Sequence, residues 1–280
     1  MYIICIDSFK PEYLKYAPYL SSLTKKYQHG ELETNLGFEG QMEEFFTGKH
    51  TKLALYYKND RSSLKWTRNF AFFGKYLLNV LINLHRLLKN KRRLIFTHNI
   101  PLKKLHYFDT SVDYEPTQYL NVKYMHIGIL DATVHKYGTS HDKTIKCIKQ
   151  IDNWLKTQNF YIVMSDHGMM NINEIITVPE TEVCFIDSTM ARYWNEKPEL
   201  PLDKGKIIKA DEKYGETIFL ANPGVLILPN YWQGKKQVKA MHGYDSKHED
   251  MKAFYLIKKE GKRKDLTMNQ LHEVFAKNLS

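Results

Sequence analysis

The chain has few cysteines and lacks long apolar runs. Its three cysteines, Cys5, Cys147 and Cys184, lie far apart without the spacing of a metal site. We interpret them as core residues of a reduced, intracellular protein. No apolar stretch is long enough to cross a bilayer, and the first residues lack the basic region and cleavage site of a secretory leader. We therefore expect a cytoplasmic protein, either free or peripheral to a membrane.

Low-complexity segments are also absent. A chain of 280 residues can hold one large α/β domain, or one such domain with an inserted subdomain. The formal net charge of +10 favours anionic ligands, although much of it is dispersed lysine of the kind found on solvated faces. Because the basic residues mostly lack interleaved aromatic side chains, we do not expect nucleic acid as a partner.

Polar residues follow three predicted strands at the points where the strands end. The apolar run Phe160 to Met164 stops at Asp166 and His167, the opening strand Ile3 to Ile6 stops at Asp7, and the run Tyr124 to Leu130 stops at Asp131. In a parallel α/β sheet, ligands bind at the carboxyl ends of the strands. Taken alone, an Asp-His pair suits a metal site, an acid/base pair or a polar turn.

Together these residues form a set of oxygen and nitrogen donors. His135 lies four residues after Asp131, which places both side chains on one side of a helical turn. The full set suits Zn²⁺ or Mn²⁺ and is large enough for two ions about 3.5 to 4 Å apart. Its members are Asp7, Asp131, His135, Asp166, His167 and His242.

The remaining pattern alternates helices and strands. Gly37-Phe-Glu-Gly40 precedes a helical run, and such a turn offers free backbone N–H groups to an anion. We expect helices at Glu12 to Tyr27 (stopped by His29-Gly30), Gln41 to Phe46, His141 to Leu155 and Met268 to Lys277. We expect strands at Glu31 to Leu36, Ile175 to Val178, Val183 to Ile186 and Ala253 to Ile257, a hairpin of Thr217 to Leu220 with Val225 to Leu228, a helix start at Asp187 to Arg192, and a loop from Pro198 to Lys209.

Residues 52–118 interrupt this alternation. Apolar side chains follow helical spacing from Trp66 to Arg93, and the segment ends in the basic run Lys89-Asn-Lys-Arg-Arg93. We interpret residues 52–118 as a helical cap inserted into one domain that spans 1–280. The helix is either packed over the sheet as a lid or laid with its basic face on a membrane surface.

Three motifs occur in a characteristic order: Leu130-Asp-x-x-x-His-x-x-Gly138, Ser165-Asp-His-Gly-Met169 and Met241-His-Gly-Tyr-Asp245. Together with Asp7, Phe46-Thr-Gly48 and the apolar lead-in Ile218 to Pro229, they resemble the nucleotide pyrophosphatase/phosphodiesterase (type I phosphodiesterase) branch of the alkaline phosphatase superfamily. The resemblance covers about 1–51 and 119–257. It implies a three-layer α/β sandwich, with helices on both faces of a mostly parallel central sheet, and a bimetallic, usually dizinc, centre.

The resemblance also implies roles for individual residues. Asp131, His135 and His242 would hold one ion, and Asp7, Asp166 and His167 would hold the other. In the family, a Thr or Ser at the start of the second helix attacks phosphorus, but that position here falls at Phe38 or Glu39. Glu39 is therefore our candidate catalytic residue, as a nucleophile, a general base or a further ligand. Candidate contacts to the phosphate or the leaving group are Gly40, Gln41, Lys49 and Arg192.

We accordingly expect a metal-dependent hydrolase or transferase that acts on phosphate esters through a two-metal centre. The expected substrates are phosphodiesters or pyrophosphates on a small or lipid-linked molecule. The Cys-x-Pro-x-Arg motif of sulfatases is absent. Because the usual hydroxyl nucleophile is missing, the alternative is a non-catalytic protein of the same fold that binds metal and phosphate. The sequence does not predict the oligomeric state.

Overall fold

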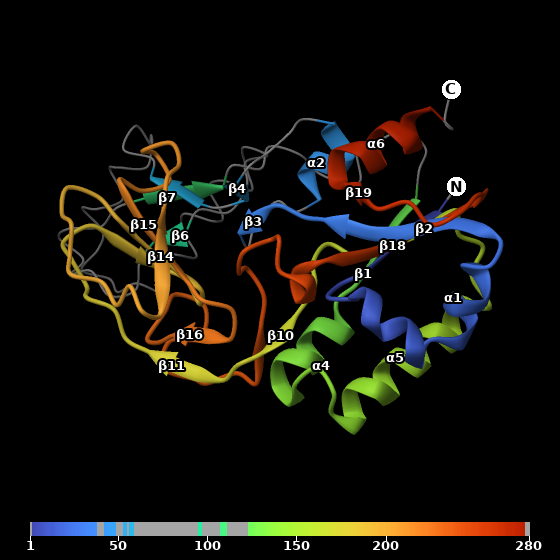
Figure 1. Ribbon diagram of the computed structural model, residues 1–280, viewed down its shortest axis with the longest axis horizontal. Coiled ribbons are helices and arrows are strands. Elements are labelled where there is room, and N and C mark those ends of the chain that lie inside the picture. The colour runs from blue at the N-terminus through green and yellow to red at the C-terminus, as the bar shows by residue number, and fades with distance from the viewer. Residues whose placement is uncertain are drawn as a thin grey trace, which may run out of the picture.

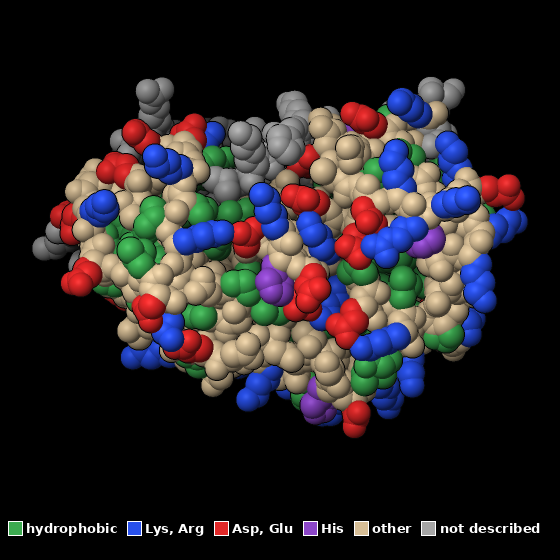
Figure 2. Space-filling model, in the orientation of Figure 1, with side chains coloured by type: hydrophobic (Ala, Val, Ile, Leu, Met, Phe, Trp, Pro, Cys, Tyr) green, Lys and Arg blue, Asp and Glu red, His purple; other side chains and the backbone are tan. Residues whose placement is uncertain are grey.

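A computed structural model describes residues 2–37, 42–48, 53–54, 56–58, 95–96, 107–110 and 123–277. Figure 1 shows a larger lobe, built from a central sheet with helices on both sides, beside a smaller lobe made mostly of short strands. Within the described ranges, no helix combines the length and the apolar character needed to cross a bilayer. On the face shown in Figure 2, Lys and Arg side chains are interspersed with Asp and Glu.

The central sheet has six strands in the order β19-β2-β18-β9-β1-β8. Strand β18 is antiparallel to both of its neighbours, β2 and β9, and the other pairings are parallel. The predicted mostly parallel sheet is therefore confirmed. The strands are β1 (Tyr2–Ile6), β2 (Tyr27–Glu33), β8 (Lys123–Ile127), β9 (Ile162–Met164), β18 (Ala253–Glu260) and β19 (Leu266–Thr267).

Strands β1 and β9 are adjacent inner strands of the sheet and are apolar on both faces, as expected for strands covered by helices on each side. Because successive side chains of a strand alternate between faces, Ile4 and Val163 pack into one core, while Ile3 and Ile162 pack into the other. Cys5 of β1 is buried here, and Cys147 and Cys184 are also buried and free. The prediction that the cysteines are core residues is confirmed.

Helices cover both faces of the sheet (Figure 1), which confirms the three-layer arrangement. One face carries η1 (Pro11–Tyr16), α1 (Pro18–Leu23), α4 (Ile129–Tyr137) and α5 (Asp142–Leu155), and the other carries α2 (Glu43–Thr47) and α6 (Met268–Ala276). Helix α5 turns Ile148 and Leu155 into the core. Its buried Asp152 accepts hydrogen bonds from the backbone N–H groups of Tyr19 and Leu20, both at 2.9 Å. Asp152 thus caps α1, whose own N-cap residue, Ala17, has no side-chain acceptor.

The single helix predicted from Glu12 to Tyr27 is wrong. Pro18 divides it, because the residue before a proline is disfavoured in the helical region, and Ala17 has φ −119° and ψ 73°. The second helix ends at Leu23, and the predicted helix stop at His29-Gly30 lies inside β2. A Cβ at Gly30 would lie 2.3 Å from the Lys264 carbonyl oxygen. Glycine is therefore needed at this position of β2, because the backbone at Lys264 passes so close to it.

The smaller lobe contains a four-stranded antiparallel sheet in the order β12-β13-β15-β14. Its strands are β12 (Cys184–Ile186), β13 (Met190–Tyr193), β14 (Gly205–Ile208) and β15 (Thr217–Ala221). The helix start predicted at Asp187 to Arg192 is wrong. Residues 187–189 turn the chain from β12 into β13, and Arg192 lies in β13. The loop predicted from Pro198 to Lys209 is wrong at its end, where β14 pairs with β15.

The predicted hairpin between Thr217 and Leu228 is also wrong. Val225 N–H does donate to the Asn222 carbonyl at 3.0 Å, as a turn at Asn222-Pro-Gly224 requires. However, β15 lies between β13 and β14, so both of its edges are taken. Strand β16 (Val225–Ile227) pairs instead in parallel with β11 (Glu174–Ile176). A second pair, antiparallel, joins β10 (Met170–Asn171) to β17 (Ala240–Met241).

The described parts of the predicted cap are short strands. Strand β3 (Leu36–Gly37) pairs in parallel with β4 (Leu53–Ala54), and β5 (Tyr56–Lys58), β7 (Tyr107–Thr110) and β6 (Ile95–Phe96) form a small antiparallel sheet. The helix predicted from Trp66 to Arg93 lies outside the described residues.

Candidate metal centre

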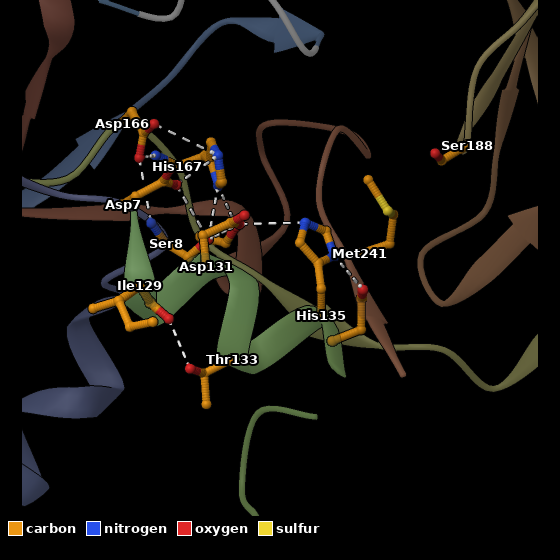
Figure 3. A network of polar contacts seen from close by, with 12 residues as sticks. Asp7, Ser8, Ile129, Asp131, Thr133, His135, Asp166, His167, Ser188 and Met241 are labelled. Atoms are coloured by element: carbon orange, nitrogen blue, oxygen red, sulfur yellow. Dashed lines mark hydrogen bonds and ion pairs between the residues drawn. The ribbon is translucent and has the colours of Figure 1, made fainter. Parts of the chain in front are cut away.

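The first group of predicted ligands lies at the ends of two adjacent parallel strands. Asp7 follows β1, and Asp166 and His167 follow β9, so the pairing of these strands brings the three side chains to one edge of the sheet. His167 Nε2 lies 3.3 Å from Asp7 Oδ1 and 3.7 Å from Asp166 Oδ2. The three side chains point toward one another (Figure 3). We call them the Asp7 half-site.

The second group, Asp131, His135 and His242, is the Asp131 half-site. Asp131 and His135 lie one turn apart in α4, with Asp131 Oδ1 at 3.3 Å from His135 Nε2. His242 directly follows β17, which pairs with β10, and β10 begins three residues after His167. This pairing stacks the rings of His242 and His167, with centroids 3.8 Å apart. The His135 ring lies 5.3 Å from the His242 ring, centroid to centroid.

The two half-sites form one cluster. Donor atoms of Asp7, Asp166 and His167 lie within 4.8 Å of one another, and so do those of Asp131, His167 and His242. His167 therefore borders both groups. All six residues predicted from the sequence are brought together, although Asp131 has His167 as a close neighbour in addition to the expected His135 and His242.

Gly168 explains part of this geometry. A Cβ at this position would lie 2.0 Å from the Asp250 carbonyl oxygen. The loop after β9 can therefore pass close to the backbone of η5 (Glu249–Met251), where Gly168 N–H donates to the Met251 carbonyl at 3.1 Å. This contact fixes the position of His167, the neighbouring ligand in the sequence.

The donor set fits zinc in chemistry and in spacing. Zinc bonds to His nitrogen and carboxylate oxygen are about 2.0 to 2.2 Å long, so neighbouring ligands of a tetrahedral ion are about 3.3 to 3.5 Å apart. The separations in the Asp7–His167 and Asp131–His135 pairs are both 3.3 Å. His135 Nδ1 bonds to the Ala240 carbonyl at 2.8 Å, and His167 Nδ1 bonds to the Gly168 carbonyl at 2.9 Å. These bonds leave each Nε2 directed at the cluster, as is usual for metal-binding histidines.

The electrostatics of the cluster favour a positive charge. Burial and the nearby Asp166 raise the pKa of Asp7 to about 6. Burial alone would lower the pKa of His167, but the charges of Asp166, Asp7 and Asp131 raise it to about 9. Burial and the neighbouring His167 lower the pKa of His242 well below its usual value, which favours the neutral imidazole that a metal ion requires. A bound cation would take the place of the proton that these closely spaced carboxylates attract.

Two residues that we did not predict touch the ligands. His126 in β8 lies with Nε2 3.0 Å from Asp7 Oδ2 and with Nδ1 3.1 Å from the Tyr124 hydroxyl. Ser8 donates a hydrogen bond of 2.6 Å to Asp131 Oδ1. Their positions in the sequence were the available signal for both residues. His126 lies in the strand that leads toward Asp131, and Ser8 directly follows Asp7.

Among the predicted substrate contacts, only Arg192 lies in the described part of the chain, and it is not part of this cluster. Arg192 is fully buried in β13 and pairs with Asp187, Nη2 to Oδ2 at 3.2 Å, so the contact to phosphate that we predicted for it is not supported by its position. Its side chain stacks on Phe185 instead. Glu39, Gly40, Gln41 and Lys49 lie outside the described residues.

Comparison with known proteins gives similarity of fold. No family model and no curated protein matches the chain by sequence. Among solved structures, it is similar to two of murine ectonucleotide pyrophosphatase/phosphodiesterase 5. One is the protein itself and the other is an inactive variant in complex with AMP, and the TM-score is 0.66 for each. The human counterpart gives 0.65. Identity is 15%, and the alignments cover 100% of this chain and 94% of each of those chains. The fold expected from the motifs is thereby confirmed.

Proposed function

We propose that the chain is a metal-dependent phosphoester hydrolase or phosphotransferase that works through a two-ion centre. The observation that carries this proposal is the convergence of six Asp and His side chains at the carboxyl edge of a sheet whose fold is shared with phosphodiesterases. Zinc suits the donor set best, and manganese is the second choice.

The Asp7 half-site would hold one ion and the Asp131 half-site the other. Bound ions of this kind polarise phosphoryl oxygens and offset the negative charge that develops as phosphorus is attacked. The protein's own contribution is to fix the ligands: α4 holds Asp131 and His135 one turn apart, and the backbone carbonyls of Ala240 and Gly168 orient two of the imidazole rings.

We propose phosphodiesters or pyrophosphates of small, nucleotide-like molecules as substrates, because a protein of similar fold is known in complex with AMP. The position of the family's hydroxyl nucleophile falls at Phe38 or Glu39, and Glu39 is our proposed attacking or proton-accepting group, with Gly40 and Gln41 at the phosphate. A lipid-linked substrate and membrane contact through the basic run ending at Arg93 are the less favoured version, and a cytoplasmic location goes with either.

Metal analysis and turnover test this proposal together. The purified chain should carry about two zinc or manganese ions, and chelation should abolish release of nitrophenol from bis(nitrophenyl) phosphate. Asp166→Ala should lose the activity. Asp203→Ala, a matched change of an exposed aspartate whose nearest cation lies 3.9 Å away, should keep it. A native protein without metal would rule out the proposal.

The same experiment decides between an enzyme and a binding protein. The alternative is a protein that binds metal and phosphate without catalysis. It is favoured because the family's hydroxyl nucleophile is missing, and because Ser8, which carries a hydroxyl at the described site, is fully buried. If the chain binds two ions yet hydrolyses no phosphomonoester, phosphodiester or pyrophosphate, it is a metal- and phosphate-binding protein. If Glu39→Gln leaves turnover unchanged, Glu39 has no chemical role.

A further inference from the structure

Ser8 has an unusual backbone conformation for a residue with a side chain. Its φ is 67°, in the left-handed region that glycine adopts most readily. Phe9 N–H donates to the Ile6 carbonyl at 3.2 Å, which places Ser8 at the third position of a tight turn after β1, where positive φ usually requires glycine. Strained residues of this kind persist where their surroundings hold them, and they concentrate at functional sites.

The contacts of Ser8 join the two half-sites. Its backbone N–H donates to Asp166 Oδ1 at 3.3 Å, and its hydroxyl donates to Asp131 Oδ1 at 2.6 Å. The same hydroxyl oxygen lies 3.5 Å from Asp7 Oδ1 and 3.5 Å from His167 Nδ1. Ser8 therefore touches all three members of the Asp7 half-site and the aspartate of the other, at the centre of the network in Figure 3.

A hydroxyl has one proton to donate. At 2.6 Å from a carboxylate oxygen, the proton of Ser8 is committed to Asp131, which fixes the orientation of that carboxylate. The amide of Ser8 acts in the same way on Asp166. Both effects depend on the left-handed backbone, because the tight turn is what directs the amide and the hydroxyl of one residue at two different carboxylates.

We propose that Ser8 is a positioning residue that couples the two half-sites, and that its strained backbone is retained for this purpose. The inference rests on the proposed function, because it presupposes that the six ligands bind metal. Ser8 is fully buried, which is consistent with a role through the ligands and not through direct contact with substrate. Partners that hold metal ligands in place typically contribute 10- to 100-fold to metal affinity.

Two substitutions separate the hydroxyl from the backbone strain. Ser8→Ala removes the hydroxyl and keeps the strain, while Ser8→Gly removes both. The matched control is Asn195→Gly, since Asn195 also has positive φ (66°) but lies exposed beyond β13. Metal affinity is measured by competition with a chromogenic chelator under titration of Zn²⁺, and the melting temperature of the metal-free proteins is measured by calorimetry.

We expect both Ser8 variants to bind both ions about tenfold or more weakly than the wild type. In the metal-free state, Ser8→Gly should melt about 2 °C or more above Ser8→Ala, because glycine relieves the left-handed backbone. Asn195→Gly should bind both ions as the wild type does. This pattern would separate a positioning role from a merely structural one, since a structural residue would change the melting temperature alone.

Three results would overturn the inference: unchanged affinity in both Ser8 variants, weakening of one ion only, or a metal-free Ser8→Gly that melts no higher than Ser8→Ala. Failure of the proposed function has a different signature. In that case the wild type and Asn195→Gly would also bind no metal, and the inference about Ser8 would fall with it.

Discussion

Arg192 provides a sharp test of what the smaller lobe does. Its Nη2 lies 3.2 Å from Asp187 Oδ2, its Nη1 donates to the Tyr214 carbonyl at 3.2 Å, and its guanidinium lies 4.6 Å from the centroid of the Phe185 ring. Both charged side chains are buried. We expect Arg192→Ala to destabilise the fold without weakening the binding of substrate.

The magnitude follows from the burial of the pair. Removing one partner of a buried ion pair leaves an uncompensated charge and costs about 3 to 5 kcal/mol. At about 2.1 cal/mol/K per residue, the entropy of unfolding of a 280-residue chain is about 0.6 kcal/mol/K. The melting temperature should therefore fall by about 5 to 9 °C. Trp232 Nε1–H donates to Asp187 Oδ1 at 2.9 Å. The double variant Arg192→Met with Asp187→Asn should lose less than Arg192→Ala, because it leaves no charge behind while the Asn oxygen can still accept from Trp232.

Calorimetry and kinetics of the same samples decide the matter. The Lys204→Ala control breaks a surface pair, Nζ to Glu174 Oε1 at 2.8 Å, and should change the free energy of unfolding by less than about 1 kcal/mol. The KM for a phosphodiester should match that of the wild type in every folded variant. An Arg192→Ala protein that melts like the wild type but has a raised KM would refute the reasoning and restore Arg192 as a substrate contact.

Other predictions follow from single contacts. His126→Ala removes the ring at 3.0 Å from Asp7 Oδ2 and should weaken one metal ion about tenfold in a chelator competition; equal affinity would contradict this. Asp152→Ala leaves the half-buried N–H of Tyr19 and the buried N–H of Leu20 without their acceptor and should cost about 2 to 4 kcal/mol in urea unfolding, whereas a loss under about 0.5 kcal/mol would exclude the cap. Hydrogen bonds from Lys10 and Lys15 lower the pKa of Glu12 from 4.5 to about 2, so its stabilisation is present above pH 4.5 and disappears as the pH falls toward 2. Because this carboxylate is half exposed, Glu12→Gln should cost at most about 1 kcal/mol at neutral pH, and a difference that persists at about pH 2 would show another cause.

The larger lobe and the clustering of the candidate ligands were predictable for a common physical reason. Strands buried on both faces must be apolar throughout, so β1 and β9 stand out as short apolar runs, and α5 shows its buried face at helical spacing. The residues that end parallel strands meet at one edge of the sheet. This is why a sequence pattern alone could bring Asp7 and Asp166 together.

The smaller lobe depends on pairings between segments that are distant in sequence. Local turn residues at Asn222 and Gly224 suggested a hairpin, yet the strand partners were decided by β13, β14 and β11. Arg192 was a candidate substrate contact, and arginine is rarely buried unless it is paired. Its partner, Asp187, faces it only once β12 and β13 have paired.

Ser8 and His126 show a different limit. Serine after aspartate is common in turns. The residue types alone do not predict the left-handed backbone of Ser8 or the hydrogen bond from its hydroxyl to Asp131. His126 belongs to a strand whose apolar neighbours suggested only packing. Both residues gain their roles from geometry that exists after the sheet has formed.

The position of β1 in the sheet has a consequence for the way the chain is made. It leaves the ribosome well before its neighbours β8 and β9, which begin at Lys123 and Ile162. At the usual 5 to 20 residues per second, its apolar edges stay unpaired for on the order of ten seconds during synthesis. An unpaired apolar strand is a template for association with other chains. Nascent-chain protection of residues 2–6 is therefore a condition for a high yield of folded protein, and the strand that carries Asp7 to the candidate metal centre is exposed to aggregation before that site has formed.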